Sequence, residues 1–297
     1  MLQKLSVAIT AGALLAASAL PGSAETVLEK VARTGILSAG LQMDLVPYAY
    51  LDDKDNLVGH SVDLIAALRG TLSQYLKRDI VLDFEEVKSA DRIPKVVGRE
   101  VDIVCDSVFY TWERDRFVDY SLTYAITGIR LLVKKDSALG TPQSLSGKRI
   151  VAGANSPAEQ TIRAVQPQVV PVAFATIPEA YRALVEGKVD AVAGDSIALA
   201  GFRATLPKPD DFKIVPQEAY SRYGVACITP EDNSKFLDLV NYTIVSGMQG
   251  YIDGDPAAAE KVDRWFGPDG LVKTDPKVIR DFYQQVIDMR EQVQLAK

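Results

Sequence analysis

Apolar and polar positions along this chain alternate with two periods, and segments of the two kinds follow one another. The run from Gly35 to Gln42 is typical of a buried strand, and apolar residues at helical spacing predict a helix from the N-cap Ser61 to about Lys77. Ile80 to Val87 alternates as a strand does, and Ser89 is placed to cap a short helix. This order predicts an α/β fold with mostly parallel strands.

A short apolar phrase that ends in a carboxylate beside a hydroxyl occurs twice. The first copy runs from Val101 to Ser107 and the second from Val189 to Ser196. Each copy follows a helix-like segment and a turn with glycine, so each predicts a buried strand with polar groups at its end. Ligands of open parallel sheets bind beyond the carboxyl ends of strands. The repeat therefore predicts two similar lobes that face one cleft.

Between and beyond these copies the pattern predicts a second series of strands and helices. A charged and aromatic connection from Thr111 to Tyr124 precedes it, and Pro178 is placed at the first position of a helix, where a missing N–H costs nothing. The other predicted elements are strands at Gly128–Lys135, Arg149–Gly153, Val169–Phe174 and Tyr223–Thr229, and helices that begin near Pro157, Glu231, Ala257 and Pro276.

The first residues predict export. Lys4 provides a short positive start, Leu5 to Leu20 is apolar and uncharged, and Gly22-Ser23-Ala24 offers small residues for cleavage. This is the pattern of a secretory signal peptide over residues 1–24. The apolar run is shorter than the ~20 residues of a spanning helix, and no cysteine follows it, so neither a membrane anchor nor a lipid anchor is expected.

Composition excludes several classes of function. The 297 residues allow one large domain or two ordinary ones, and a hydrophobic content of 47% is ample for a packed core. A formal net charge of −6 without a basic tract argues against nucleic acid as a partner. One histidine, His60, and two cysteines leave no set of zinc ligands, and we expect no cofactor.

The two cysteines are Cys105 and Cys227. An exported protein could join them in a disulfide. However, each lies in an apolar strand-like run, and the predicted order of elements separates the two strands. We therefore expect two buried thiols, with the disulfide as the alternative.

Several short segments, in their order and spacing, resemble the bacterial extracellular solute-binding proteins of the polar amino-acid uptake systems. These are the type II periplasmic binding proteins that feed ABC importers. The similar segments are Val58–Leu64, Thr111–Arg114, Ser146–Ile150, Gly187–Ala191, Gly194-Asp195, Tyr223–Ala226 and Trp265–Gly267. The glutamate/aspartate-binding branch is the most similar, at Ser89–Pro94, Thr127–Lys135 and Lys208–Phe212.

The resemblance implies two lobes with mixed, mostly parallel sheets, joined by two crossing strands. Residues 25–125 and 228–297 would form lobe 1, and residues 126–227 lobe 2. It also implies a monomer in the periplasm that holds an amino-acid-like solute between its lobes. The solute would then pass to an ABC permease of the inner membrane.

A free amino acid carries a carboxylate and an ammonium, and each needs a charged partner when it leaves water. The family binds the carboxylate with an arginine, whose fork can bond both oxygens, and Arg114 falls on that position. The alternative is a surface ion pair with Asp115 or Asp119, worth about 0–1 kcal/mol. Asp195 matches the family's ammonium-binding aspartate; the alternative is an N-cap for the helix that begins at Ser196.

Three further positions match solute contacts of the family, and a fourth is a candidate from its place at a helix start. Ser107 matches a hydroxyl or amide contact at a strand end, with a turn as the alternative. Ser156 begins a helix whose free N–H groups attract an anion, although capping alone explains it nearly as well. Arg92, with its neighbour Ser89, matches the contact to an acidic side chain; the alternative is a solvated helix charge.

Several departures from the branch bear on the solute. The branch has glycine where this chain has Asp106, which could neutralise Arg92 or meet a cationic solute. It also has a hydroxyl residue at Phe109 and an arginine at Gln42. The branch also has a histidine at Ile177 and an aromatic residue at Leu45, although Tyr48 and Tyr50 lie close to Leu45. Its second-lobe loop of the Gly-Thr-Thr/Ser type is Asn155-Ser156-Pro157 in this chain. A strict glutamate site would not be built this way. A neutral, aromatic or cationic amino acid, or a related small molecule, stays open.

Two functions therefore compete. The first is a binding protein that passes its solute to a permease. The second is an exported enzyme on the same scaffold, such as a dehydratase of a small carboxylic acid, which needs an acid or base tuned near working pH. Asp106 is the one odd carboxylate of the expected cleft and supports the second view, whereas His60 is interpreted as structural. A sensor ectodomain is disfavoured, because no anchor or signalling segment follows.

Overall fold

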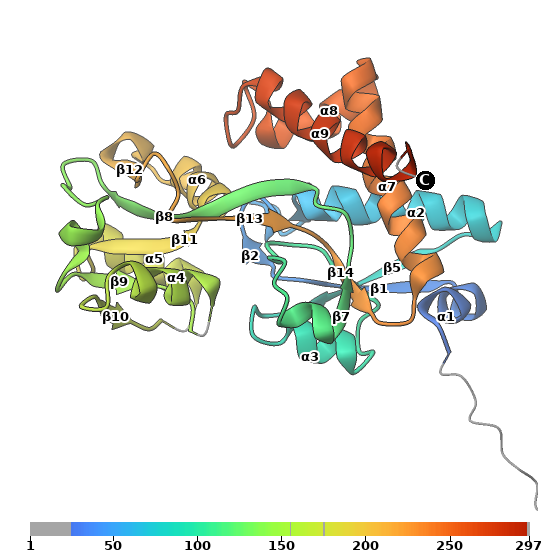
Figure 1. Cartoon of the computed structure of the whole chain (residues 1–297), viewed down its shortest axis with the longest axis horizontal. Coiled ribbons are helices and arrows are strands. Elements are labelled where there is room, and N and C mark those ends of the chain that lie inside the picture. Colours follow the sequence, from blue (N-terminus) through green and yellow to red (C-terminus); the bar gives the residue numbers. More distant parts are fainter. Residues whose placement is uncertain (1–24, 155, 175, 296–297) are drawn as a thin grey trace, which may run out of the picture.

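The computed structural model describes residues 25–154, 156–174 and 176–295. The expected signal peptide lies outside the described residues. Two β-sheets, each packed with helices, form two lobes that lie side by side (Figure 1). Within these ranges, no helix combines the length and apolar character needed to cross a membrane.

The first lobe is built on a mixed sheet in the order β5-β1-β6-β14-β7. Its strands are β1 (Ile36–Leu41), β5 (Val81–Glu86), β6 (Ile103–Val104), β7 (Val118–Tyr120) and β14 (Ile228–Pro230). The neighbours β5, β1 and β6 are parallel, and β14 runs antiparallel to both β6 and β7. A small sheet, β2 (Asp44–Leu45), β3 (Ala49–Leu51) and β4 (Leu57–Val58), lies between β1 and the next helix along the chain.

The second lobe has a similar sheet in the order β10-β9-β11-β8-β12, with β13 also paired to β8. Its strands are β8 (Ala125–Lys134), β9 (Arg149–Val151), β10 (Val170–Val172), β11 (Ala191–Asp195), β12 (Phe212–Val215) and β13 (Ser221–Val225). Strands β9, β10 and β11 are parallel, whereas β8 is antiparallel to its partners. The predicted fold class, α/β with two mixed sheets, is confirmed.

Helices cover both sheets. In the first lobe they are α1 (Val27–Thr34), α2 (His60–Leu76), α3 (Arg92–Val97), α7 (Ser234–Asp253), α8 (Pro256–Phe266) and α9 (Pro276–Leu295). In the second lobe they are α4 (Pro157–Val165), α5 (Ile177–Val185) and α6 (Ser196–Thr205), and short 3₁₀ turns occur at η1 (Arg114–Arg116), η2 (Pro142–Leu145) and η3 (Pro209–Asp211). The three C-terminal helices lie together on one side of the first lobe (Figure 1).

The repeated phrase performs the same structural task in both lobes. In the first copy, the carboxylate of Asp102 accepts a hydrogen bond from the backbone N–H of Ser38 at 2.9 Å. In the second copy, Asp190 accepts one from the N–H of Arg149 at 2.8 Å. Each aspartate thus ties the start of its own strand to the neighbouring parallel strand. Each also has a cationic partner, Lys30 and Arg149 respectively.

Three predicted helix starts are wrong in detail. Helix α2 begins at His60, one residue before the expected cap, and its N-cap Gly59 has φ 144°. A Cβ at Gly59 would lie 2.1 Å from the carbonyl oxygen of Tyr48, so this close approach requires glycine. Ser89 does not cap α3, which follows Asp91 without a side-chain cap. Helix α5 begins at Ile177, which places Pro178 at the second position.

The single strand predicted from Tyr223 to Thr229 is in fact two strands in different sheets. Strand β13 pairs with β8 in the second lobe, and β14 pairs with β6 and β7 in the first. Ala226 and Cys227 join them, so the chain changes lobe at this point. The apolar pattern continues across the change and so did not reveal it, although β14 is buried and β13 only partly so. The expected lobe boundaries at residues 125 and 227 stay a prediction.

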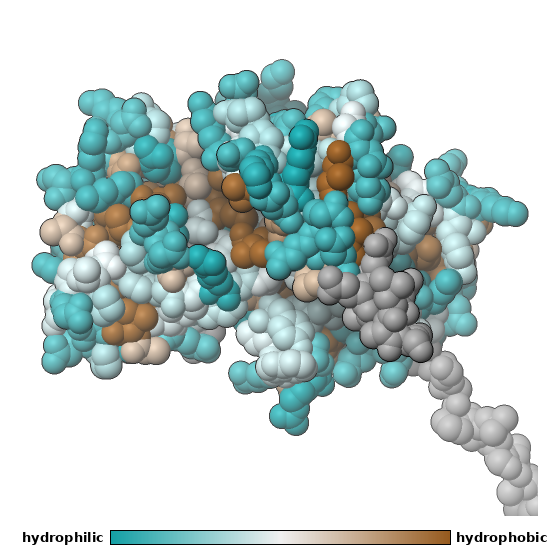
Figure 2. Space-filling model, turned by 45° about the horizontal axis from the view of Figure 1, so that its top comes forward, coloured by the Kyte–Doolittle hydropathy of each residue, from teal (hydrophilic) through white to brown (hydrophobic). Residues whose placement is uncertain are grey.

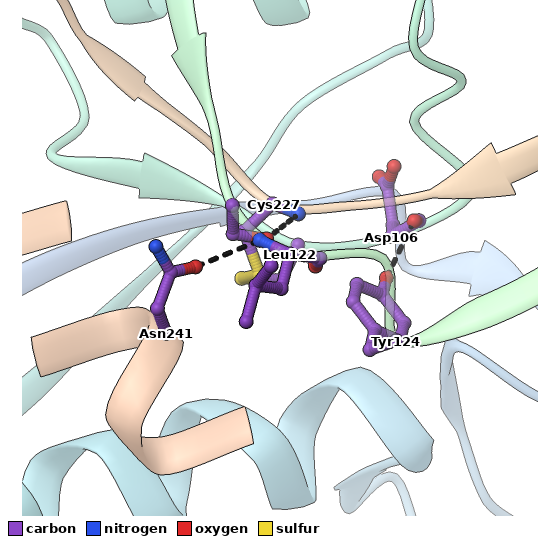
Figure 3. The surroundings of a disulfide bond; sticks show 7 residues. Asp106, Leu122, Tyr124, Cys227 and Asn241 are labelled. Carbon is purple, nitrogen blue, oxygen red and sulfur yellow. Dashed lines mark hydrogen bonds between the residues drawn. A yellow bond between two sulfur atoms is a disulfide. The ribbon is translucent and has the colours of Figure 1, made fainter. Parts of the chain in front are cut away.

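The expectation of two free thiols is wrong, because Cys105 and Cys227 form a disulfide with their Cα atoms 4.2 Å apart (Figure 3). Strand β14 inserts between β6 and β7, and Ile228 pairs with Val104. This sheet order brings together two segments that are remote in the sequence. Around the disulfide, the N–H of Cys227 donates to the hydroxyl of Ser121 at 2.8 Å.

Removal of the disulfide should lower the free energy of unfolding. The bond closes a segment of 122 residues, and freeing a loop of this size in the unfolded chain costs about 2–5 kcal/mol of stability. We expect the double variant Cys105→Ala/Cys227→Ala to unfold at lower urea concentration than the oxidised wild type. Reductant should shift the wild type toward the variant and leave the variant unchanged. Equal urea midpoints for both proteins would contradict the prediction.

His60, the single histidine of the chain, packs within the first lobe. Its ring meets Phe266 edge-on, with ring centroids 4.9 Å apart, and lies 5.8 Å from the ring of Tyr124. Burial lowers the pKa of His60 from 6.5 to about 4, and the nearby Asp63 carboxylate only partly opposes this effect. The imidazole is therefore neutral at physiological pH.

This histidine makes a clean titration probe because no other imidazole signal overlaps it. We expect its proton NMR resonance to titrate near pH 4 rather than 6.5. Between these two values the unfolded chain binds a proton that the folded chain does not. The contribution of His60 to stability is therefore present above pH 6.5 and is lost as pH falls toward about 4. A resonance that titrates near 6.5 in the folded protein would refute the assignment.

Candidate functional site

The carboxyl ends of β6 and β11 meet where the two lobes are in contact. The approach is close, because a Cβ at Gly201 of α6 would lie 2.7 Å from the carbonyl oxygen of Val46 in the other lobe. Several apolar patches of the visible face lie along the boundary between the lobes (Figure 2). The two polar ends of the repeated phrase are thus brought together, as expected from the positions of ligands in parallel sheets.

Asp195 is the buried carboxylate at the end of β11. Its Oδ1 accepts hydrogen bonds from the backbone N–H groups of Ile197 at 2.7 Å and Ala198 at 3.1 Å. The hydroxyl of Thr127 on β8 donates to the same oxygen at 2.7 Å. The expected alternative, an N-cap for α6, is therefore confirmed.

The other oxygen of Asp195 faces the first lobe. Its Oδ2 accepts from the hydroxyl of Ser107 at 2.6 Å and from that of Tyr48 at 3.0 Å. Burial, together with the Asp195 carboxylate, raises the pKa of Tyr48 well above its ordinary value, so the phenol keeps the proton that it donates. One carboxylate thus joins the two lobes through hydroxyl groups. Ser107 and Asp195, the ends of the two copies, are direct partners.

A second polar cluster surrounds Arg92 and Asp106, and Asp106 directly precedes Ser107 in the sequence. The Nη2 of Arg92 is 3.1 Å from Oδ2 of Asp106, and the two side chains are 8% and 0% exposed. The same Nη2 donates to the side-chain oxygen of Gln42 at 2.9 Å. Nη1 donates to the hydroxyl of Ser89 at 3.3 Å and to the carbonyl oxygen of Ser107 at 3.2 Å. The alternative of a solvated helix charge is wrong for Arg92.

Each member of this ion pair keeps one unbonded polar atom. Nε of Arg92 and Oδ1 of Asp106 are buried and have no hydrogen-bond partner among the described residues. Desolvation raises the pKa of the Asp106 carboxyl, and the Arg92 guanidinium and the N–H of Gln42 oppose that rise. The hydroxyl of Tyr124 donates to the backbone carbonyl of Asp106 at 2.6 Å and holds this strand end in place (Figure 3).

Arg114 lies in η1, beside the strand end that carries Phe109. Its Nη1 is 3.5 Å from the carbonyl oxygen of Phe109. Tyr120 donates to the same carbonyl, and burial raises the pKa of Tyr120 to about 12 against the opposing effect of the Arg114 charge. Arg114 is therefore next to the Ser107–Phe109 segment, although no hydrogen bond described in the structure joins it to Asp195.

The side chain of Phe109 makes an aromatic stacking contact rather than a polar one. Its buried ring stacks on Tyr223 of β13 with centroids 4.9 Å apart and an interplanar angle of 9°. The hydroxyl of Tyr223 lies 3.3 Å from that of Thr161 on α4. A stacked pair of rings thus crosses from the first lobe to the second.

Ser156 caps α4, and its hydroxyl accepts from the N–H of Glu159 at 3.2 Å. Its role toward an anion stays a prediction, and Asn155 lies outside the described residues. Two contributors, Thr127 and Tyr48, were not predicted as ligands of Asp195. The signal for Thr127 was its place at the start of a segment similar to the family. For Tyr48 it was the nearness in sequence to Leu45, the position where the family has an aromatic residue.

The interlobe bonds of Asp195 predict a change in shape when they are removed. In the double variant Tyr48→Phe/Ser107→Ala, Oδ2 loses both donors from the first lobe. A hydrogen bond to a charged group contributes about 1.5–3 kcal/mol, so the unliganded lobes should separate more often. Small-angle X-ray scattering should record a larger radius of gyration than in the wild type.

The matched control is Ser156→Ala, which removes a hydroxyl that bonds within one lobe. It should leave the scattering curve unchanged. Superimposable curves for the double variant and the wild type would show that these bonds do not hold the lobes together.

Known proteins are similar to this chain in sequence and in fold. The family model described as "Bacterial extracellular solute-binding proteins, family 3" matches residues 37–268. The glutamate/aspartate import solute-binding protein of Escherichia coli K12 is 28% identical over 88% of this chain and 86% of its own length. A glutamine-binding protein of Geobacillus stearothermophilus is 31% identical over 67% of this chain and 74% of its own. The structure of an ancestral arginine-binding protein bound to arginine is similar with a TM-score of 0.69 at 25% identity, covering 78% of this chain and 99% of that one.

Proposed function

Since the chain belongs to family 3 of the bacterial extracellular solute-binding proteins, we propose that it is an amino-acid-binding protein of an ABC importer. The protein holds its solute between the two lobes. The observation that carries the proposal is the position of Asp195. This carboxylate is buried where the lobes meet and is bonded by hydroxyl groups of the first lobe.

Asp195 has the chemistry that an α-ammonium group requires. An ammonium carries three donors and a positive charge, so it can take the place of the hydroxyls of Ser107 and Tyr48 at Oδ2. The bonds at Oδ1 lie within the second lobe and would persist. Arg114 is the proposed partner of the α-carboxylate, because its planar fork can bond both oxygens. Ser107 bonds to Asp195 and lies two residues before Phe109, whose carbonyl oxygen is next to Arg114.

Capture then follows from the geometry of the two lobes. When the lobes open, the hydrogen bonds from Ser107 and Tyr48 to Asp195 break. A solute in contact with both lobes replaces them with hydrogen bonds of its own. The ligand therefore shifts an equilibrium between open and closed forms. A permease of the inner membrane would receive the solute from the closed form. The disulfide is consistent with an exported, periplasmic protein.

The site does not favour an enzyme. Asp106, the carboxylate that supported this alternative, is engaged by Arg92 and by the N–H of Gln42. The ion pair engages Oδ2 and leaves Oδ1 without a partner in the described part of the chain. Burial favours the neutral carboxyl, but the charge of Arg92 opposes this effect and favours the ionised form of Asp106, which cannot act as a general acid. The curated relatives described above are named for import or binding, and the chain is likewise a binding protein.

Loss of Arg114 should abolish amino-acid binding while the fold persists. In Arg114→Ala a buried carboxylate of the solute would lose its partner, which costs about 2–5 kcal/mol. A thermal-shift screen of the wild type against the common amino acids first identifies ligands, because a ligand at 100 times its dissociation constant adds about 2.7 kcal/mol of stability. Calorimetry then compares the variant with the wild type.

Arg116→Ala is the matched control, since Arg116 is an exposed arginine of the same 3₁₀ turn. It should bind the ligand as the wild type does. Unchanged affinity in Arg114→Ala would overturn the assignment of Arg114. The absence of any amino-acid ligand in the screen would overturn the proposed function.

A further inference from the structure

We propose that the buried Arg92–Asp106 pair determines which solute is accepted, selecting a neutral amino acid with a carboxamide side chain and rejecting acidic ones. The inference rests on the proposed function, because it takes Asp195 and Arg114 as the partners of the α-ammonium and α-carboxylate. The pair lies close to that position. Ser107 donates to Asp195 through its hydroxyl and accepts from Arg92 through its carbonyl.

Arg92 is already committed to acceptors of the protein. Its Nη2 faces Asp106 and Gln42, and its Nη1 faces Ser89 and the carbonyl of Ser107. A guanidinium that is neutralised in this way cannot compensate a second carboxylate. An acidic side chain would therefore bring an unpaired negative charge beside two buried carboxylates, Asp106 and Asp195. Burying an unpaired charge is strongly unfavourable.

Charge balance favours a neutral side chain. Asp106, Asp195 and Arg92 are all buried, so this cluster holds two carboxylates and one guanidinium. The α-ammonium compensates Asp195, and Arg114 compensates the α-carboxylate. With a neutral side chain every charge then has a partner. A cationic side chain would add a positive charge next to a pair that is already neutral.

The two unbonded atoms restrict the chemistry of the solute side chain further. Within the part of the chain that the structure describes, Nε of Arg92 is a donor without an acceptor, and Oδ1 of Asp106 is an acceptor without a donor. A solute carboxylate can only accept, and an ammonium or guanidinium can only donate. An apolar side chain does neither, and would leave both buried atoms unsatisfied. A hydroxyl both donates and accepts, but from a single oxygen atom. A carboxamide offers a carbonyl oxygen and an NH₂ group as separate atoms on one planar unit, so it can satisfy both buried atoms at once.

Calorimetry on the wild type with glutamine, asparagine, glutamate, arginine, serine and leucine tests this directly. We expect one of the two carboxamide amino acids to bind at least about 100-fold more tightly than the other four, as in sites whose buried polar groups would otherwise stay unpaired. Equal or tighter binding of glutamate, arginine, serine or leucine would overturn the inference. The proposed function would then stand, because an amino acid still binds. No binding of any amino acid would instead overturn the proposed function.

The variant Asp106→Asn tests the role of the pair. It removes the negative charge and leaves Arg92 uncompensated, so the ratio of carboxamide to glutamate affinity should fall by about 100-fold. Asp102→Asn is the matched control: Asp102 is a buried carboxylate at the start of the same segment, paired with Lys30. It should leave the ratio unchanged. An unchanged ratio in a folded Asp106→Asn protein would overturn the inference, and if that variant does not fold, the wild-type affinities decide.

Discussion

The carboxylate of Asp195 is the group on which the arrangement of the two lobes depends. A buried carboxylate requires donors for its lone pairs, and here the donors come from both lobes. The first turn of α6 and Thr127 supply those of the second lobe, while Ser107 and Tyr48 supply those of the first. The requirement of one side chain thus links the capping of a helix to the contact between lobes. The same requirement makes this position suitable for an ammonium.

The first lobe holds its side of the contact rigidly. Ser107 follows Cys105 by two residues, and the disulfide fixes that strand end to β14, where the chain returns from the second lobe. The hydroxyl of Tyr124 bonds the carbonyl of Asp106 between them. When the lobes approach each other, the donor from the first lobe is therefore already in position. Such preorganisation reduces the entropy that binding must overcome.

Asp106 changes the chemistry of a neighbouring arginine. In the glutamate/aspartate branch, as the resemblance implies, glycine stands at this position and the arginine matched by Arg92 meets an acidic side chain. In this chain the carboxylate of Asp106 lies 3.1 Å from the guanidinium of Arg92. A single residue at the end of a strand can thus convert a group that attracts a negative charge into half of a neutral pair. The scaffold and the proposed contacts to the α-ammonium and α-carboxylate of the solute need not change.

The sequence by itself determined the class of fold and most of its elements. Periodicity located the strands and helices, and the repeated phrase identified the strand ends, because these signals depend on residues within one segment. The helix-capping role of Asp195 was also local and was foreseen. Only the tertiary structure decided the disulfide, the division of the strand near Ala226 and the pairing of Arg92 with Asp106. These depend on which strands become neighbours and how two lobes meet. A hydrophobic pattern specifies that a strand is buried, but it does not specify the partner against which it is buried.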